Sequence, residues 1–164
     1  MELYFFRHGH AEDAQGPDFD DFARKLTDKG IERTVSAGQA LAKLGVKPAR
    51  IYTSPRLRAR QTADLLSSAL GVNPEAKEEL NFGFNPKLLP ALINDIANDL
   101  AVIFVGHEPD LSITVSDLVG GGEIEMKKGG VARVDLLART PLRGVLLWVL
   151  TPRVLEVVAG QGVK

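Results

Sequence analysis

The chain begins with a short apolar run, residues 3–6, that leads without a break into Arg7, His8 and Gly9. A continuous apolar stretch of this length is typical of a strand that is covered on both faces of a sheet. The three residues behind it bring a guanidinium that fits phosphate oxygens, an imidazole that reacts at neutral pH, and a glycine that allows a sharp turn. This pattern predicts a buried strand that ends in a polar, reactive turn.

The same pattern occurs again later in the chain. Residues 101–105 form a second continuous apolar run, and Gly106 and His107 follow it directly. Further strands are predicted at residues 49–53, 74–77, 131–137 and 145–150, with a turn at residues 141–144 between the last two.

Helices are predicted between these strands. Thr27 is a good N-cap for a helix that runs to about residue 44 and stops at Gly45. Ser54 as N-cap and Pro55 at the first helical position predict a second helix, which Gly71 ends. A third helix is predicted up to about residue 98, and Pro109 opens a fourth. The inner face of the first helix is expected to contain Ile31, Val35, Leu41 and Leu44.

Strands that alternate with helices predict an α/β fold, a three-layer sandwich whose mainly parallel central sheet carries helices on both faces. The 164 residues suffice for a single domain, residues 1–164, with one sizeable core. A formal net charge of −1 argues against a nucleic-acid partner, and no apolar run approaches membrane-spanning length. There is no cysteine and no signal-peptide pattern at the start, so we expect a cytoplasmic protein.

Three strand-to-helix junctions carry the residues that point to function. In such sheets ligands bind at the carboxyl ends of the strands, and these ends deliver Arg7 with His8, Arg58, and His107. Two arginines can neutralise the oxygens of a phosphoryl group, and a histidine can accept that group in line. The sequence therefore predicts a phosphoryl-transfer site.

Other charged residues are interpreted as solvated. Arg56 and Arg60 are expected to form an exposed basic face of the second helix. Most charges of the acidic stretch that follows His10 are expected to face solvent on a surface loop, and Arg24 is a minor candidate for the phosphate site. The acidic residues are Glu12, Asp13, Asp18, Asp20 and Asp21, around Gly16 and Pro17.

These motifs resemble the histidine phosphatase superfamily, which is also called the phosphoglycerate mutase-like fold. The resemblance rests on Arg7-His8-Gly9, on residues 54–62 and on Gly106-His107, and it is greatest for the SixA-type phosphohistidine phosphatases. Residues 25–30 and 149–152 add to it, so that it covers nearly the whole chain. It implies that His8 is the phosphorylated nucleophile and that Arg7, Arg58 and His107 bind the phosphoryl group. We expect neither a cofactor nor a metal.

The resemblance also bears on the substrate. Many mutases and phosphomonoesterases of this fold carry a carboxylic acid near position 79 that protonates the leaving oxygen, and Glu78-Glu79 matches that pattern poorly. An imidazole leaving group is readily protonated without such an acid. No long inserted lid is evident, so the site is expected to admit a side chain of another protein. We therefore expect the substrate to be a phosphorylated histidine-containing protein, with inorganic phosphate as product.

Three other hypotheses are weaker. The main alternative is a small-molecule phosphomonoesterase that uses Glu78 or Glu79 as its acid. A non-catalytic phosphate-binding module is disfavoured because both motif histidines are intact. A metal hydrolase built on His8 and His10 is weaker still, because carboxylate ligands at motif spacing are not evident nearby.

Overall fold

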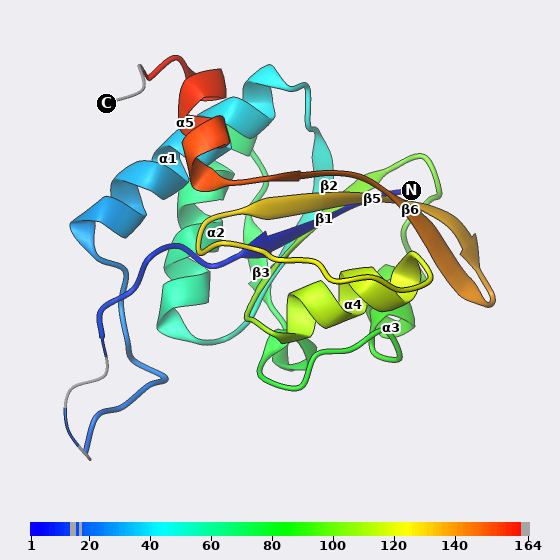
Figure 1. Cartoon of the computed structure of the whole chain (residues 1–164), viewed down its shortest axis with the longest axis horizontal. Coiled ribbons are helices and arrows are strands. Elements are labelled where there is room, and N and C mark those ends of the chain that lie inside the picture. The colour runs from blue at the N-terminus through cyan, green and yellow to red at the C-terminus, as the bar shows by residue number, and fades with distance from the viewer. Residues whose placement is uncertain (14–15, 17, 162–164) are drawn as a thin grey trace.

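Six strands form one sheet in the order β3-β2-β4-β1-β5-β6 (Figure 1). The structure is a computed structural model, and it describes residues 1–13, 16 and 18–161. Strands β1 to β4 pair in parallel, whereas β5 and β6 run antiparallel to their neighbours. This confirms the predicted mainly parallel sheet. The strands are β1 (Glu2–Arg7), β2 (Pro48–Thr53), β3 (Pro74–Ala76), β4 (Ala101–Gly106), β5 (Val131–Arg139) and β6 (Leu142–Leu150).

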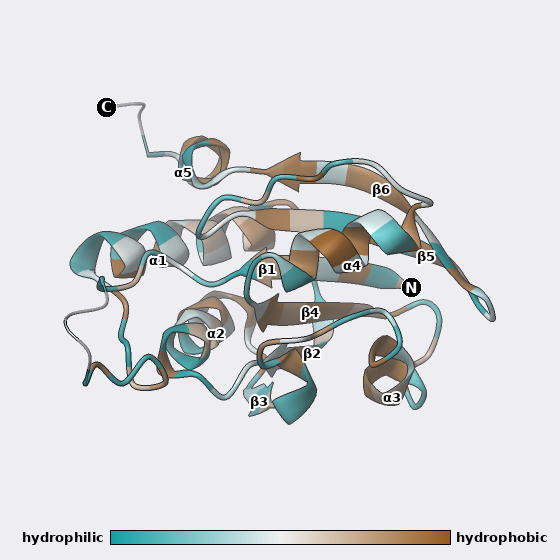
Figure 2. Ribbon diagram, turned by 60° about the horizontal axis from the view of Figure 1, so that its bottom comes forward, coloured by the Kyte–Doolittle hydropathy of each residue, from teal (hydrophilic) through white to brown (hydrophobic). Residues whose placement is uncertain are grey.

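Helices cover both faces of this sheet, as predicted (Figure 2). One face packs against α1 (Asp28–Lys43), α2 (Leu57–Leu70) and α5 (Pro152–Ala159). The opposite face packs against a 3₁₀ helix, η1 (Glu78–Leu80), and against α3 (Leu89–Ile93) and α4 (Asp110–Leu118). Among the helices of the described residues, none is long and apolar enough to cross a membrane.

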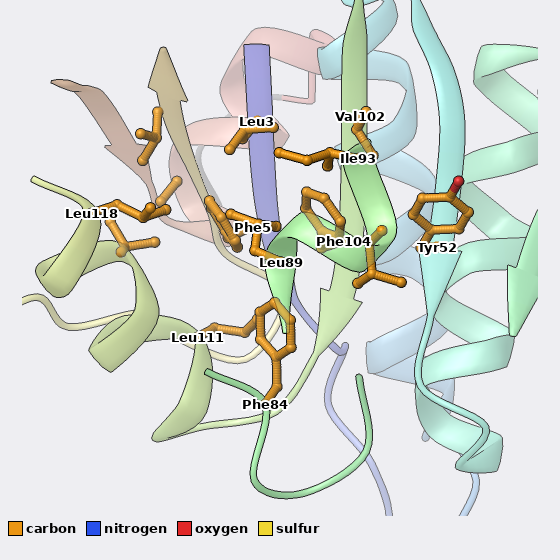
Figure 3. Close-up of a cluster of buried hydrophobic side chains, with 14 of the residues drawn as sticks. Leu3, Phe5, Tyr52, Phe84, Leu89, Ile93, Val102, Phe104, Leu111 and Leu118 are labelled. Carbon is orange, nitrogen blue, oxygen red and sulfur yellow. The ribbon is translucent and has the colours of Figure 1, made fainter. Parts of the chain in front are cut away.

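Strand β1 shows why the apolar run must be unbroken. Successive side chains of a strand point to opposite faces, so Leu3 and Phe5 enter the core beneath α3 and α4 (Figure 3). Tyr4 and Phe6 enter the second core beneath α1, α2 and α5. All four side chains are almost fully buried. A polar residue at any of these positions would lie in one of the two cores.

Helix α1 confirms its predicted cap but not its predicted inner face. The hydroxyl of Thr27 accepts a hydrogen bond from the backbone N–H of Gly30 at 3.1 Å. The prediction for Ile31, Val35 and Leu44 was wrong, because these side chains are 38%, 37% and 48% exposed. The buried face consists of small residues and one leucine: Gly30, Thr34, Ser36, Ala37, Gly38, Ala40 and Leu41. Small side chains are required because the helix lies close to its neighbours; a Cβ on Gly38 would lie 3.0 Å from that of Ala69.

The start of α2 lies later than predicted. The helix begins at Leu57 with Arg56 as N-cap residue, and the Ser54 hydroxyl only accepts a 3.3 Å bond from the Arg56 N–H. The segment from residue 54 to 56 is therefore a turn rather than the first turn of the helix. Gly71 ends α2 in the left-handed conformation, as predicted.

Three further boundaries differ from the predictions. Helix α3 spans only Leu89–Ile93 instead of reaching residue 98, and Pro109 is the N-cap of α4 rather than its first residue. Strand β6 begins at Leu142, within the predicted turn at residues 141–144, because the hairpin of β5 and β6 closes at Thr140 and Pro141. Of the predicted acidic loop, Pro17 lies outside the described residues.

Gly30 provides a test of how closely α1 packs against the turn after β1. A Cβ on Gly30 would lie 2.0 Å from the carbonyl oxygen of His10. We expect Gly30→Ala to lower the free energy of unfolding by about 1–3 kcal/mol, as overpacking typically does. Urea denaturation measures this change. Lys29→Ala, at an exposed position of the same turn, is the control. A stabilised Gly30→Ala protein, the usual result of this exchange inside a helix, would contradict the close packing.

Candidate active site

The parallel pairing of β1 and β4 brings the two motif histidines together. Arg7 is paired with Gly106, so the next residue of each strand lies at the same edge of the sheet. The backbone N–H of His8 donates to the carbonyl of Gly106 at 3.1 Å. The centroids of the His8 and His107 rings are 5.2 Å apart, and both side chains are buried. The structure thus places these two predicted residues in one site.

Hydrogen bonds define the tautomer of His8. Its Nδ1 lies 2.8 Å from the carbonyl oxygen of Gly9, which can only accept, so Nδ1 carries the proton. Its Nε2 accepts from Nε of Arg58 at 3.2 Å and is therefore unprotonated, with its electron pair directed at that donor. Burial lowers the pKa of His8 to about 3, and the charges of Arg58 and Arg7 add to this effect. The ring is neutral at physiological pH, with Nε2 as its basic atom.

The turn that carries His8 is fixed by α1 and α2. The backbone N–H of Gly9 donates to the hydroxyl of Thr62 at 3.0 Å, and that hydroxyl donates to the Arg58 carbonyl at 2.7 Å. A Cβ on Gly9 would lie 2.7 Å from the hydroxyl oxygen of Thr34, so only glycine fits here without rearrangement. The turn behind the imidazole is therefore fixed by contacts with both helices.

Arg58 lies in the first turn of α2 and reaches into the site, as predicted. Its side chain is only 1% exposed. Besides the contact with His8, Nη1 donates to the backbone carbonyl of Asp21 at 2.8 Å, and Nη2 lies 3.2 Å from its carboxylate. The guanidinium thus joins Nε2 of His8 to Asp21, which lies 37 residues before Arg58 in the chain.

His107 lies next to the His8 ring. Its Nε2 is 2.8 Å from the hydroxyl of Ser54, and its Nδ1 is buried without a hydrogen-bond partner among the described residues. Burial lowers the pKa of His107 to about 2, with additional contributions from His8 and Arg58. This second imidazole is also neutral.

Arg7 completes the predicted set. Its Nη1 donates to the carbonyl of Met126 at 2.7 Å, while its Nε is buried and has no partner in the part of the chain that the structure describes. Its positive charge is close enough to contribute to the low pKa of His8. The site therefore contains two neutral imidazoles beside two guanidinium groups.

Asp21 is an exception within the acidic stretch, most of whose charges were expected to face solvent. Its carboxylate contacts three guanidinium groups, those of Arg24 at 2.9 Å, Arg56 at 2.7 Å and Arg58 at 3.2 Å. Burial acts to raise the pKa of Asp21, but the three positive charges outweigh it and hold this pKa below its usual value. Arg24, a minor sequence candidate for the phosphate site, thus contacts the same carboxylate as Arg58.

Arg56 is likewise not a solvated residue. Its Nε donates to the side-chain oxygen of Asn81 at 2.7 Å, and its guanidinium carbon lies 3.9 Å from the centroid of the Phe82 ring. Phe82 in turn contacts His107 edge-on, with 4.8 Å between the ring centroids. Arg60 is exposed, as predicted. Sequence reasoning missed Asp21, Arg56 and Phe82 as neighbours of the site because their partners lie far away along the chain.

The carboxyl groups near the site differ in their placement. Glu78 is exposed and Glu79 is half-buried, and within the described residues neither forms a hydrogen bond with a side chain of the site. Glu108 directly follows His107 and accepts a hydrogen bond from the hydroxyl of Ser112. Burial raises the pKa of Glu108, although Ser112 and Arg7 act against this. The position of Glu108 next to the motif histidine was the one sequence signal that could have identified it as a neighbour of the site.

His10 belongs to no cluster of metal ligands within the described residues. Its Nδ1 lies 2.9 Å from the hydroxyl of Thr27, at the start of α1. Over residues 1–13, 16 and 18–161, the structure contains no group of three or more His, Cys, Asp or Glu side chains that could hold a metal ion. Chemically, the site combines an uncharged nucleophilic nitrogen with cationic donors, which suits an anionic electrophile.

Comparisons with known proteins agree with this geometry. A sequence model described as the histidine phosphatase superfamily (branch 1) matches residues 3–82. An uncharacterized protein of Picosynechococcus sp. is 39% identical over 137 residues, a match that covers 80% of this chain and 82% of that protein.

Solved structures share the fold over nearly the whole chain. The protein histidine phosphatase SixA in complex with tungstate matches with a TM-score of 0.80 and 26% identity, over 93% of this chain and 97% of that chain. A mycobacterial glucosyl-3-phosphoglycerate phosphatase in complex with inorganic phosphate matches with a TM-score of 0.69 and 17% identity, over 92% and 98% of the two chains. The chain therefore belongs to the histidine phosphatase superfamily, and it resembles SixA in both sequence and fold.

Proposed function

We propose that this phosphatase removes the phosphoryl group from phosphohistidine in a protein, through a covalent intermediate on Nε2 of His8. The observation that carries the proposal is the state of the His8 ring. Its proton is held on Nδ1 by the Gly9 carbonyl, and its free Nε2 faces the buried guanidinium of Arg58. A neutral, oriented imidazole next to a fixed cation is what nucleophilic attack on a phosphoryl group requires.

The first chemical step transfers the phosphoryl group to the enzyme. As the substrate enters, its oxygens take over hydrogen bonds from Arg58, which releases the electron pair on Nε2 of His8. Nε2 forms a bond to phosphorus while the bond from phosphorus to the substrate nitrogen breaks in line with it. Arg7 and Arg58 compensate the charge on the phosphoryl oxygens, and His107 binds them from the other side. The departing imidazole takes a proton from water.

The second step returns the enzyme to its first state. A water molecule attacks phosphorus, the bond between phosphorus and Nε2 breaks, and inorganic phosphate leaves. One proton of the water is released, and the electron pair returns to Nε2. His8 is again neutral, with its proton still on Nδ1. Throughout the cycle this N–H donates a hydrogen bond to the Gly9 carbonyl.

Two observations support a phosphorylated histidine-containing protein as substrate. Neither Glu78 nor Glu79 forms a hydrogen bond with the described side chains of the site, which suits a leaving nitrogen that is easily protonated. The similar SixA protein is a protein histidine phosphatase whose structure contains tungstate, an oxyanion with the shape of phosphate. By analogy with SixA, we propose the same substrate class for this chain.

One observation supports the alternative function, a small-molecule phosphomonoesterase. An alkyl phosphate needs a general acid, and Glu108 is a half-buried carboxyl group with a raised pKa directly after His107. In this second function Glu108, rather than Glu78 or Glu79, would protonate the leaving oxygen.

The nucleophile can be tested directly. We expect His8→Ala to lower turnover of phosphoimidazole by at least about 1,000-fold, because no phosphoenzyme can form. The fold should persist, since His8 lies at a strand end. Brief mixing of the wild type with labelled substrate should give acid-labile, base-stable phosphate on His8. His10→Ala is the control and should retain turnover. Normal turnover of His8→Ala, or wild-type turnover without label, would contradict the intermediate.

The low pKa of His8 predicts an unusual pH profile. A histidine with the ordinary pKa of 6.5 loses its neutral form roughly 30-fold between about pH 7.5 and pH 5. Because burial lowers the pKa of His8 to about 3, its neutral form persists at pH 5. We expect kcat/KM for phosphoimidazole, corrected for the ionisation of the substrate, to show no acid limb above about pH 4. An acid limb of kcat/KM that is centred near pH 6.5 and persists in every other variant would contradict a buried, neutral nucleophile.

The leaving group separates the two functions. Under our proposal phosphoimidazole and aryl phosphates are hydrolysed much faster than methyl phosphate, with a gap of about 10²–10⁴, the usual contribution of a general acid. Glu78→Gln, Glu79→Gln and Glu108→Gln should each leave phosphoimidazole hydrolysis nearly unchanged. Steady-state kinetics on the three substrate types provides the measurement. A large loss in Glu108→Gln, confined to alkyl phosphates that the wild type hydrolyses well, would favour the phosphomonoesterase.

A further inference from the structure

Phe82 is an exposed aromatic residue in direct contact with the site. Its side chain is 54% exposed, yet the edge-on ring pair with His107 has centroids only 4.8 Å apart at an angle of 63°. The guanidinium carbon of Arg58 lies 5.7 Å from its centroid. A single exposed apolar side chain is ordinary on a protein surface. An exposed ring that touches a motif histidine and faces a buried arginine is not explained in that way.

The loop that carries Phe82 is anchored on both sides. The backbone N–H of Phe82 donates to the side-chain oxygen of Asn81 at 3.0 Å, and the same oxygen accepts from Arg56. The N–H of Gly83 donates to the carboxylate of Asp110, at the start of α4, at 2.8 Å. Arg56 covers part of the ring, with its guanidinium carbon 3.9 Å from the centroid. Phe82 is therefore held in a defined position although about half of it faces solvent.

We propose that Phe82 forms the subsite for the leaving group and selects substrates whose phosphoryl group is attached to a flat ring. This inference rests on the proposed function, which places the phosphoryl group between Nε2 of His8, Arg58 and His107. The leaving group must lie on the side of phosphorus opposite His8, because attack and departure are in line.

The chemistry of phosphohistidine fits this position. Its imidazole is bonded directly to phosphorus, so the ring lies within a few ångströms of His107 and Arg58 when the phosphoryl group is bound. Aromatic rings attract each other at centroid separations of about 4.5–7 Å. Phe82, in contact with His107 and within 6 Å of Arg58 at 5.7 Å, is placed to contact such a ring through its exposed part. An ammonia or methanol leaving group has no ring and would gain nothing.

Paired substrates test the subsite. Phosphoimidazole and phosphoramidate both contain a phosphorus–nitrogen bond, but only the first has a ring; phenyl phosphate and methyl phosphate form the matching oxygen pair. We expect Phe82→Leu to lower kcat/KM for each ring substrate about 2- to 10-fold more than for its ringless partner, the range of aromatic pair energies expressed as a rate ratio. Phe82→Tyr keeps the ring and should restore the preference.

Phe22 offers a matched control for the same exchange. It is 46% exposed and its ring centroid lies 5.6 Å from the guanidinium carbon of Arg56, but no contact with His107 is found for it among the described residues. Phe22→Leu should leave both ratios unchanged. Equal losses on ring and ringless substrates in Phe82→Leu would mean that Phe82 only positions His107, and the subsite would be wrong.

The two proposals fail in different ways. If the wild type turns over phosphoimidazole through His8 but Phe82→Leu leaves the ratios unchanged, the subsite is wrong and the proposed function stands. If the wild type prefers methyl phosphate and other alkyl phosphates, the proposed function is wrong, and a subsite for rings fails with it. If phenyl phosphate alone shows the Phe82 effect while phosphoimidazole is inert, the ring subsite stands and the phosphohistidine substrate is wrong.

Discussion

Arg58 is a fully buried cation, and much of the site is arranged around that charge. A buried guanidinium lowers stability unless its donors find partners, because water can no longer solvate it. Its three nitrogen atoms reach Nε2 of His8 and the backbone and side chain of Asp21. The segment around Asp21 must therefore fold back onto the N-terminal turn of α2. The carboxylate of Asp21 also forms ion pairs with Arg24 and Arg56, and no local sequence preference would bring these two arginines together.

Burial, with the charges of the arginines adding to it, determines the charge state of the histidines. Both imidazoles are buried with their ring centroids 5.2 Å apart beside cationic side chains, and both pKa values are accordingly low. The neutral pair leaves a site with surplus positive charge contributed by guanidinium groups alone. A phosphoryl dianion would compensate that charge. The same guanidinium groups thus add to the low pKa of His8 before binding and would be neutralised when the anion arrives.

The parts of this protein that could be predicted from sequence are those encoded locally. The apolar run before His8, the second run before His107, and the cap at Thr27 each lie within a few residues, and the structure confirms all three. Parallel pairing then brings the strand ends together, so His8, Arg58 and His107 could be placed in one site.

What could not be predicted depends on contacts between distant segments. The ion pairs of Asp21 with Arg56 and Arg58 span 35 and 37 residues, and an acidic residue in a loop normally faces solvent. The inner face of α1 was misjudged because large apolar residues such as Ile31 normally point inward. Here the close approach of α2 favours glycine and alanine on that face, as at Gly38. Hydrophobicity alone carries no information on how near a neighbouring helix will lie.

Arg56 connects the phosphoryl pocket to its rim. Its guanidinium contacts Asp21, which holds Arg58, and also contacts Asn81 and the ring of Phe82, which touches His107. The groups that would bind the phosphoryl oxygens and the ring that would face the leaving group therefore share one side chain. A change that displaces Asp21 would loosen Arg58 and Phe82 together. Affinity for the anion and preference for the leaving group are for this reason expected to be coupled in this enzyme rather than independently adjustable.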